Sequence, residues 1–483
     1  MVHISSIAVG FVALCSLVSA DIVRIPTKLS YRTASAPNLG ASVKLAVAAD
    51  EGLKYSGALV GTVSLGTPAQ TFGVILDTGS QTFWVRGYNC VRSASCLATD
   101  TGFNPTKSTT YVAGSAVSFE LGPYGDGLDA FGLGGIDTMV MAGISVAKSP
   151  FYYATNITVG SSSLGADGIM GIPAANLANS SFDQQYVPGT LAAAGALTSN
   201  IWGFWYNNSQ TTVGTNYLDG QLSLGGIDTA LYTGSISWAP LLWQPSTLPA
   251  ALISLSAYWF VSLTSITVGS SGNVLSTTTA PAYAGQKSSS GFAINGAGEI
   301  PFLVDTGTTL TILPTGVVAA IASALKAKTY AGAGTTGVYG PNCNSLAFTS
   351  YPNITFTLGG QTLTVPPTGY TIPDSNNNYC NGFFIFQGSA SAPLNGGILG
   401  NLQQSNYYNL FDWSGRQIGF ATPSVTGAGS GTSFSNSTTS PGTGSGTGTG
   451  TTTGSTKSSA PVRKSSGTVM AALALAAVSV LFL

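Results

Sequence analysis

A short pattern that occurs twice places the strongest constraint on how this 483-residue chain can fold. Residues 74–80 read VILDTGS and residues 302–308 read FLVDTGT, so each copy ends an apolar run with Asp-Thr-Gly. A second glycine-containing element follows each copy, GIMG at 168–171 and GILG at 397–400. The distance from the aspartate to the last glycine is 94 residues in the first case and 95 in the second. Matched motifs at matched spacing indicate two homologous halves.

The duplicated motif predicts a pair of catalytic carboxylates, Asp77 and Asp305. If a pseudo-two-fold axis relates the halves, these side chains meet at the interface, and two carboxyl groups in contact share one proton. The ionised member can take a proton from a bridging water while the protonated member polarises a scissile carbonyl. We expect two kinds of residue to support this dyad. Glycines permit the close approach of the backbones, and hydroxyl groups bond to the opposite loop or to the carboxylates. These supporting residues are Thr78, Gly79, Ser80, Thr306, Gly307 and Thr308.

The composition excludes most other catalytic chemistry. The chain has 16 Lys and Arg, 17 Asp and Glu, and one histidine, His3, which lies in a segment expected to be removed. Without another imidazole, a Ser-His-Asp triad, a Cys-His pair and a His-based zinc site are excluded, and we expect neither a metal nor a cofactor. The formal net charge of −1 argues against nucleic-acid binding.

Short β-branched runs punctuated by Gly, Pro and Asn predict a mainly-β core. Strands are expected at residues 60–65, 71–76, 266–268 and 354–358. Helical patterns are few, and the best of them lie at residues 190–197 and 317–327.

Both ends of the chain have the composition of targeting segments. Residues 7–18 form an apolar run too short to span a bilayer, and the small residues that follow predict a signal peptide ending near Ala20; a buried N-terminal helix is the alternative. Residues 469–483 form an apolar tail behind a spacer and small residues, which is the pattern of a GPI-anchor signal. A conventional tail-anchored helix is the alternative there. The Ser, Thr, Gly and Pro residues before the tail predict an extended, O-glycosylated stalk.

Glycosylation sequons and cysteines also indicate the secretory route. The N-x-Ser/Thr sequons lie at Asn156, Asn179, Asn207, Asn353 and Asn436. Apart from Cys15 in the signal peptide, the cysteines are Cys90, Cys96, Cys343 and Cys380. Four cysteines allow three pairings, and the short spacing favours Cys90–Cys96 with Cys343–Cys380 as the second bridge.

Taken together, these motifs resemble those of the pepsin family of aspartic endopeptidases over most of residues 55–423. LGTPAQ at 65–70 and DTGSQTFWV at 77–85 are similar to the opening strands and first catalytic loop of that family, including its tryptophan, here Trp84. YGDG at 124–127 resembles the flap that closes over substrate. Further similarity lies in GGIDT at 225–229, NLFD at 409–412 and IGF at 418–420.

The resemblance assigns substrate-binding roles around this flap. Tyr124, Gly125 and Asp126 would lie over the substrate, with Tyr124 hydrogen-bonded towards Trp84. The alternatives are a surface turn for Tyr124 and Asp126 and plain core packing for Trp84. Asn401 departs from the family pattern, in which Asp or Ala often follows the Ile-Leu-Gly element.

The resemblance also implies a mainly-β, bilobal, pepsin-like double β-barrel fold with pseudo-two-fold related lobes. The expected organisation is a signal peptide at 1–20, a propeptide at 21–53, an N-terminal lobe at 54–235, a C-terminal lobe at 236–423, the stalk at 424–458 and a removed GPI-anchor signal at 459–483.

The expected function is aspartic endopeptidase activity at acidic pH, at the cell surface or in the cell wall. Within the pepsin family, the resemblance is to the fungal, GPI-anchored (yapsin-like) type. The partners implied are a peptide or protein substrate in the inter-lobe cleft and a membrane reached through the lipid anchor; we expect a monomer and no nucleic acid. The alternatives are a catalytically silent pepsin-fold binding protein or wall mannoprotein, and an adhesin with a ligand-binding head.

Overall fold

The structure is a computed structural model, and the part of the chain that it describes is mainly β. The described residues are 23–31, 57–91, 102–114, 119–120, 124, 128–158, 166–175, 187–195, 197–206, 220–329, 339–373, 378–389 and 393–424. The predicted signal peptide and anchor signal, most of the predicted propeptide, and all of the predicted stalk after Ser424 therefore lie outside the described residues.

The largest sheet has fourteen strands and includes a closed barrel. Its order is β12-β27-β26-β10-β11-β1-β2-β3-β9-β4-β8-β7-β5, with β6 also on β7, and an additional β2–β7 pairing closes β2-β3-β9-β4-β8-β7 into a six-stranded ring. The strands of this sheet are β1 Val23–Tyr31, β2 Gly57–Leu65, β3 Gln70–Asp77, β4 Phe83–Val91, β5 Val112–Ala113, β6 Phe119–Glu120, β7 Asp129–Met141, β8 Ile144–Thr158, β9 Gly168–Gly171, β10 Ile201–Tyr206, β11 Gly220–Leu224, β12 Tyr232–Pro240, β26 Tyr408–Asp412 and β27 Gln417–Pro423.

The second half of the chain builds a seven-stranded sheet in the order β21-β20-β13-β16-β25-β17-β24. Its strands are β13 Phe260–Val268, β16 Ile300–Val304, β17 Thr311–Pro314, β20 Ile354–Leu358, β21 Gln361–Val365, β24 Phe386–Ser389 and β25 Gly397–Leu399. Three two-stranded ribbons are formed by β14 Gln286–Lys287 with β15 Ala293–Asn295, β18 Lys328–Thr329 with β19 Tyr339–Gly340, and β22 Thr371–Ile372 with β23 Phe383–Phe384.

Strand burial follows from position in these sheets. In β20, towards one edge, buried and partly exposed residues alternate because one face meets the core and the other meets solvent. In β9 and β16, every residue is buried. Each of these two strands has a parallel neighbour inside its sheet, where both faces are covered.

Helices are few and short in the described part of the chain, as expected. The α-helices are α1 Val187–Ala193, α2 Thr315–Ala324, α3 Pro367–Tyr370 and α4 Asn401–Gln404. The 3₁₀ turns are η1 Pro105–Lys107, η2 Ala250–Ala257, η3 Pro281–Ala284, η5 Phe348–Ser350, η6 Tyr379–Asn381 and η7 Pro393–Asn395. The helix expected at 190–197 begins earlier, at Val187, and ends at Ala193, ahead of Gly195 with its left-handed φ of 69°. The helix expected at 317–327 ends before Lys326, whose φ is 50°.

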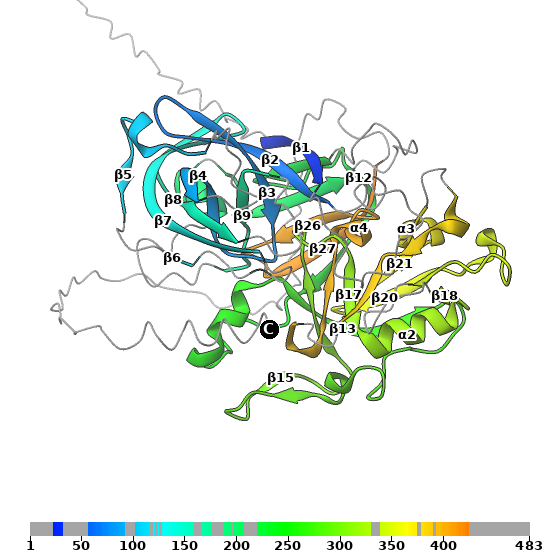
Figure 1. The fold of residues 1–483 in the computed structure, drawn as a ribbon. Helices are drawn as coiled ribbons and strands as arrows, with labels where there is room; N and C mark the ends of the chain where they lie inside the picture. Colours follow the sequence, from blue (N-terminus) through cyan, green and yellow to red (C-terminus); the bar gives the residue numbers. More distant parts are fainter. Residues whose placement is uncertain are drawn as a thin grey trace, which may run out of the picture.

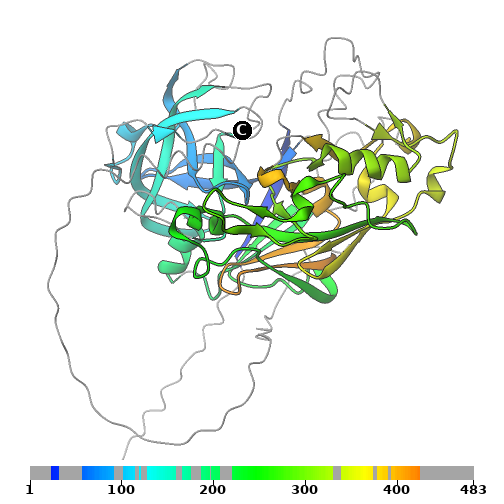
Figure 2. The same cartoon turned by 90° about the horizontal axis from the view of Figure 1, so that it is seen from below.

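The two halves of the chain form two lobes. Figure 1 shows the strands of the first half, blue to cyan, apart from those of the second half, green to yellow, with β26 and β27 between them. The view in Figure 2 shows the same separation from below. Pairing of β27 with β12 and of β26 with β10 ties the end of the folded chain into the large sheet. The expectation of a mainly-β, bilobal fold is confirmed.

One strand of the large sheet comes from the region predicted to be a propeptide. The backbone of β1 pairs antiparallel with β11 from Val23↔Leu224 to Thr27↔Gly220 and then with β2 from Lys28↔Val60 to Tyr31↔Gly57. This strand therefore lies between β11 and β2 and satisfies the hydrogen-bonding edges of both.

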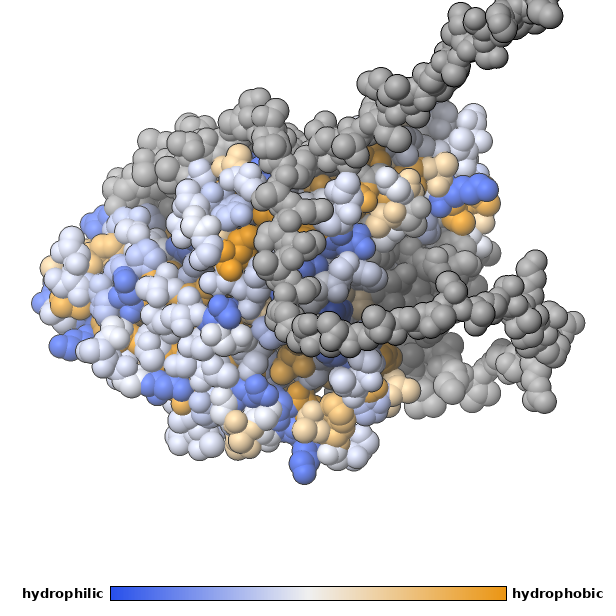
Figure 3. All heavy atoms as spheres, turned by 180° about the vertical axis from the view of Figure 1, so that it is seen from behind, coloured by the Kyte–Doolittle hydropathy of each residue, from blue (hydrophilic) through white to orange (hydrophobic). Residues whose placement is uncertain are grey.

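Most of the buried core side chains are aliphatic, and the largest fully buried ones are aromatic. Phe151, Tyr152 and Tyr153 are all buried, which indicates core packing for this run. The face shown in Figure 3 carries mainly weakly polar described residues, with strongly hydrophilic ones scattered among them. Among the described residues, we find no helix with the length and apolarity needed to cross a membrane.

Candidate active site

Two buried strands deliver the two predicted catalytic aspartates to the same place. Strand β3 ends at Asp77 and pairs in parallel with β9, so that Asp77 lies opposite Gly171. Strand β16 ends one residue before Asp305 and pairs in parallel with β25. The nearly equal spacings of 94 and 95 residues in the sequence thus reflect the same strand pairing in each lobe.

The glycines of the two motifs allow the loops to meet. A Cβ atom on Gly79 would collide with the Asp305 carboxyl group, and a Cβ atom on Gly307 would collide with the Asp77 carboxyl group. Each glycine therefore lies against the aspartate of the other lobe, where no side chain fits. Asp77 and Asp305 are 5% and 7% exposed and interact directly with each other.

Backbone and hydroxyl donors orient the two carboxylates. The Gly79 N–H donates to Asp77 Oδ1 at 2.8 Å, and the Gly307 N–H donates to Asp305 Oδ1 at 2.7 Å. The hydrogen bonding of the other carboxylate oxygen differs between the two aspartates. Thr308 Oγ1 donates to Asp305 Oδ2 at 2.5 Å, whereas Ser80 lies beside Asp77 without a hydrogen bond of normal geometry.

The electrostatics of the site favour one shared proton. Burial raises the pKa of Asp77 well above its ordinary value, and the negative charge of Asp305 raises it further. Ser80 and the Gly79 amide act in the opposite direction by stabilising the charged form of Asp77. The hydrogen bond from Thr308 stabilises charge on Asp305. These contacts favour Asp77 over Asp305 as the carrier of the shared proton.

The threonines of the two motifs join the lobes by reciprocal hydrogen bonds. The Thr78 N–H donates to Thr306 Oγ1 at 3.1 Å, and the Thr306 N–H donates to Thr78 Oγ1 at 2.9 Å. Each hydroxyl also donates to a carbonyl across the interface, Thr78 to Val304 at 2.8 Å and Thr306 to Leu76 at 2.7 Å. Both threonines are fully buried, so these bonds fix the two loops relative to each other.

Tyr124 and Trp84 are in contact, as the resemblance implies. The Trp84 Nε1–H donates to the Tyr124 hydroxyl at 2.7 Å. Trp84 is also fully buried in a small core cluster. It therefore contributes to core packing and also positions the Tyr124 hydroxyl. Gly125 and Asp126 lie outside the described residues.

Two further residues beside the dyad have no counterpart in the sequence analysis. Burial raises the pKa of Tyr258 to about 12; a hydrogen bond with Gln81 lowers it, and the charge of Asp77 adds to the rise. Tyr258 follows the 3₁₀ turn η2, and no repeat or spacing in the sequence marks it. Gln81, however, directly follows the first motif and could have been included with it.

The remaining predicted residues have mixed outcomes. The Cys343–Cys380 disulfide is confirmed, whereas Cys96 lies outside the described residues. Asn156 and Asn353 are exposed, as glycosylation sites must be, and Asn179, Asn207 and Asn436 lie outside the described residues.

Asn401, the departure from the family pattern, is buried, and its Nδ2 lies 3.5 Å from the Thr306 carbonyl oxygen. Within the described ranges, no three His, Cys, Asp or Glu side chains are grouped as metal ligands would be.

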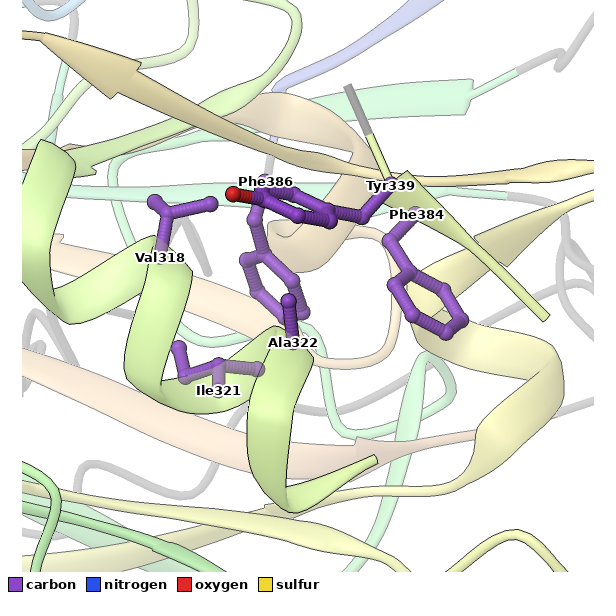
Figure 4. Close-up of a pocket in the computed structure, with 6 residues that line it drawn as sticks. All are labelled: Val318, Ile321, Ala322, Tyr339, Phe384 and Phe386. Atoms are coloured by element: carbon purple, nitrogen blue, oxygen red, sulfur yellow. The ribbon is translucent and has the colours of Figure 1, made fainter. Parts of the chain in front are cut away.

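A small recess in the C-terminal lobe is part of the core packing. Figure 4 shows α2 facing two phenylalanines and a tyrosine from β19, β23 and β24. The lining residues are Val318, Ile321, Ala322, Tyr339, Phe384 and Phe386. The lining is apolar apart from the Tyr339 hydroxyl, and a single phenol gives this recess no catalytic chemistry.

Comparisons with known proteins agree with this geometry. The sequence model of the family described as "Eukaryotic aspartyl protease" matches residues 58–423. Gastricsin from Callithrix jacchus is 32% identical over 372 residues, which cover 76% of this chain and 81% of the gastricsin. Cathepsin E from Aquarana catesbeiana is 30% identical over 371 residues, which cover 75% of this chain and 78% of the cathepsin. The crystal structure of an aspartic proteinase from Irpex lacteus shares the fold, with a TM-score of 0.58, 21% identity, and coverage of 84% of this chain and 99% of that one.

Proposed function

We propose that this chain, which belongs to the eukaryotic aspartyl protease family, is an aspartic endopeptidase that hydrolyses peptide bonds at acidic pH with Asp77 and Asp305 as its catalytic pair. The observation that carries the proposal is the meeting of these two buried carboxyl groups across the lobe interface, each against the glycine of the other motif. Like charges in contact cannot both ionise easily, so the pair holds one proton over a range of pH.

The mechanism follows from which carboxyl group holds that proton. Asp305, whose charge is stabilised by Thr308 and the Gly307 amide, takes a proton from a water molecule lying between the two carboxyl groups. Asp77 donates its proton to the scissile carbonyl oxygen as the water oxygen attacks the carbon. The tetrahedral intermediate then returns a hydroxyl proton to Asp77 as its carbonyl re-forms, the C–N bond breaks, and the amine leaves with the proton that Asp305 received.

The acid pH range follows from the same pairing. Catalysis requires the singly protonated pair, and this state is lost when both carboxyl groups ionise. Because burial and the neighbouring charge raise the pKa of Asp77, its protonated form persists through mildly acidic pH. The rate should therefore fall on the alkaline side as Asp77 loses its proton.

Substrate binding involves the segment that carries Tyr124. The hydrogen bond from the buried Trp84 indole holds the Tyr124 hydroxyl against the N-terminal lobe. An extended peptide lying across the dyad beneath Tyr124 would be shielded from water there.

The proposed location is the secretory route, ending at the cell surface or wall through a GPI anchor. A signal-peptide-like N-terminus and an anchor-like C-terminal tail support this part of the proposal. The Cys343–Cys380 disulfide and the exposed sequon asparagines Asn156 and Asn353 suit an oxidising, glycosylating compartment.

A proteolysis assay tests this function. The chain purified from a secretory host is incubated with casein or haemoglobin over a series of acid and neutral pH values, with and without a pepstatin-type inhibitor. Cleavage that is confined to acid pH and abolished by the inhibitor is expected. A folded protein with no inhibitable cleavage would favour a catalytically silent binding protein of the same fold.

A further inference from the structure

A glutamine side chain behind the second aspartate bonds directly to the backbone of the active site. Gln404 is the last residue of α4 and is fully buried. Its Nε2 donates one hydrogen bond to the Asp305 carbonyl oxygen at 2.8 Å and a second to the Leu399 carbonyl oxygen at 2.7 Å. Both partners are acceptors, so only the amide nitrogen can face them, which fixes the orientation of the side chain.

The two lobes satisfy the matching carbonyl groups by different means. In the N-terminal lobe, the Asp77 carbonyl oxygen accepts from the backbone N–H of Ile172 at 2.7 Å. Asn401 holds the matching position, but its N–H donates to the Thr308 carbonyl oxygen at 2.7 Å because α4 begins there. The donor that serves Asp77 from the backbone is thus missing for Asp305, and Gln404 provides it.

The peptide group between Asp305 and Thr306 is therefore held at both ends. Its carbonyl oxygen accepts from Gln404, and its N–H donates to Thr78 Oγ1 of the other lobe. The next amide, that of Gly307, donates to the Asp305 carboxylate. A rotation of this peptide plane would move the carboxylate and its amide donor together.

We propose that Gln404 is a positioning residue that sets the orientation of Asp305 for catalysis. This inference rests on the proposed peptidase function. The two hydrogen bonds of the Gln404 amide go to backbone carbonyls, so Gln404 acts through the backbone that carries the Asp305 carboxylate. Its loss would leave the buried Asp305 carbonyl without a donor, and the peptide plane would relax. The chemical step should suffer more than substrate binding, because the pair of carboxyl groups would no longer be aligned.

The test compares three variants of the full chain. Gln404→Leu removes both donors at similar volume. Gln403→Leu is the matched control, since Gln403 is the adjacent residue on α4, is equally buried, and bonds through its side chain to Thr311 and not to the dyad. Gln404→Glu is the conservative variant, because a protonated carboxyl group donates one hydrogen bond and an ionised one donates none.

For Gln404→Leu, kcat should fall by about tenfold to a hundredfold with little change in KM, while Gln403→Leu keeps the kcat of the wild type. At the most acidic pH values, Gln404→Glu should have a higher kcat than Gln404→Leu. The difference in kcat between these two variants should shrink as pH rises. If Gln404→Leu does not fold, the decisive quantity is the kcat of Gln404→Glu divided by the kcat of the wild type. A ratio that falls as pH rises supports the proposal.

A kcat for Gln404→Leu equal to that of Gln403→Leu would overturn the positioning role. A kcat of Gln404→Glu that stays a constant fraction of the wild-type kcat at every pH would overturn it as well. In both cases the wild type still cleaves substrate, so the peptidase function stands. A wild-type chain that cleaves nothing overturns the function, and this inference with it.

Discussion

At the scale of single residues, the proton on Asp77 links the chemistry of the site to the stability of the fold. Burial first, and the charge of Asp305 second, raise the pKa of Asp77 in the folded state above its ordinary value of 3.8. A raised pKa means that the folded chain holds this proton more tightly than the unfolded chain does. The resulting stabilisation is fully present below pH 3.8 and is lost as pH rises through the folded-state pKa.

Replacing Asp77 by asparagine should remove this loss. An asparagine side chain has nearly the same shape and cannot ionise, so Asp77→Asn should be more stable than the wild type at neutral pH and close to it at strongly acid pH. Each pH unit between the two pKa values corresponds to about 1.4 kcal/mol in the free energy of unfolding. Thermal unfolding of both proteins across the pH range measures the difference.

Asp167→Asn is a suitable control for that experiment. Asp167 forms an ion pair with Arg86 at 2.8 Å and is about a third exposed, so its replacement should give no gain at neutral pH. A wild-type chain as stable at neutral pH as Asp77→Asn would contradict the raised pKa.

Individual residues also show where sequence reasoning reaches its limit. Asp77, Asp305 and the glycines were predictable because the motif is duplicated and the chemistry needs both copies. Gln404 was not, since its role depends on α4 turning the backbone amide of Asn401 away from Asp305. The unequal hydroxyl bonds of Ser80 and Thr308 were likewise hidden, because the two motifs read almost alike at those positions.

At the scale of elements, the positions of the strands in the sequence were easier to predict than the partners with which they pair. The apolar runs before each Asp-Thr-Gly motif became β3 and β16, and the run at 354–358 became β20 with the expected alternation. The pairing of β1 with β11 joins residues close to 200 positions apart in the chain, from Val23↔Leu224 to Thr27↔Gly220, and local sequence patterns do not reveal such contacts. Helix ends shifted by a few residues where positive φ angles at Gly195 and Lys326 stop the helix.

The contact between strand β4, which carries Trp84, and Tyr124 gives a prediction about substrate handling. Tyr124→Phe removes the hydroxyl that accepts from Trp84 and so loosens the segment predicted to cover substrate. One lost hydrogen bond of this kind is worth about 1 kcal/mol, so kcat/KM should fall by about fivefold to tenfold. Steady-state cleavage of a peptide substrate measures the change.

Tyr88→Phe is the matched control, because Tyr88 lies on β4 with Trp84 but is 42% exposed. It should leave kcat/KM unchanged. Equal activity for Tyr124→Phe and Tyr88→Phe would show that the contact with Trp84 has no part in catalysis.

At the scale of the whole molecule, the two lobes have one active site because neither lobe completes it alone. Thr78 and Thr306 bind each other's backbone across the interface, and each glycine makes room for the aspartate of the other lobe. The duplication in the sequence predicted this interface. The large sheet that runs through both lobes could not be predicted, because it is completed by β26 and β27 from the end of the folded chain.

The most direct test of the account is the acid proteolytic activity of Asp77→Asn and Asp305→Asn beside the wild type. Both variants should fold, as shown by a cooperative thermal transition, and each alone should lose cleavage of casein at every acid pH, because one carboxyl group cannot serve as both acid and base. Wild-type cleavage rates in either folded variant would contradict a mechanism shared between the two lobes.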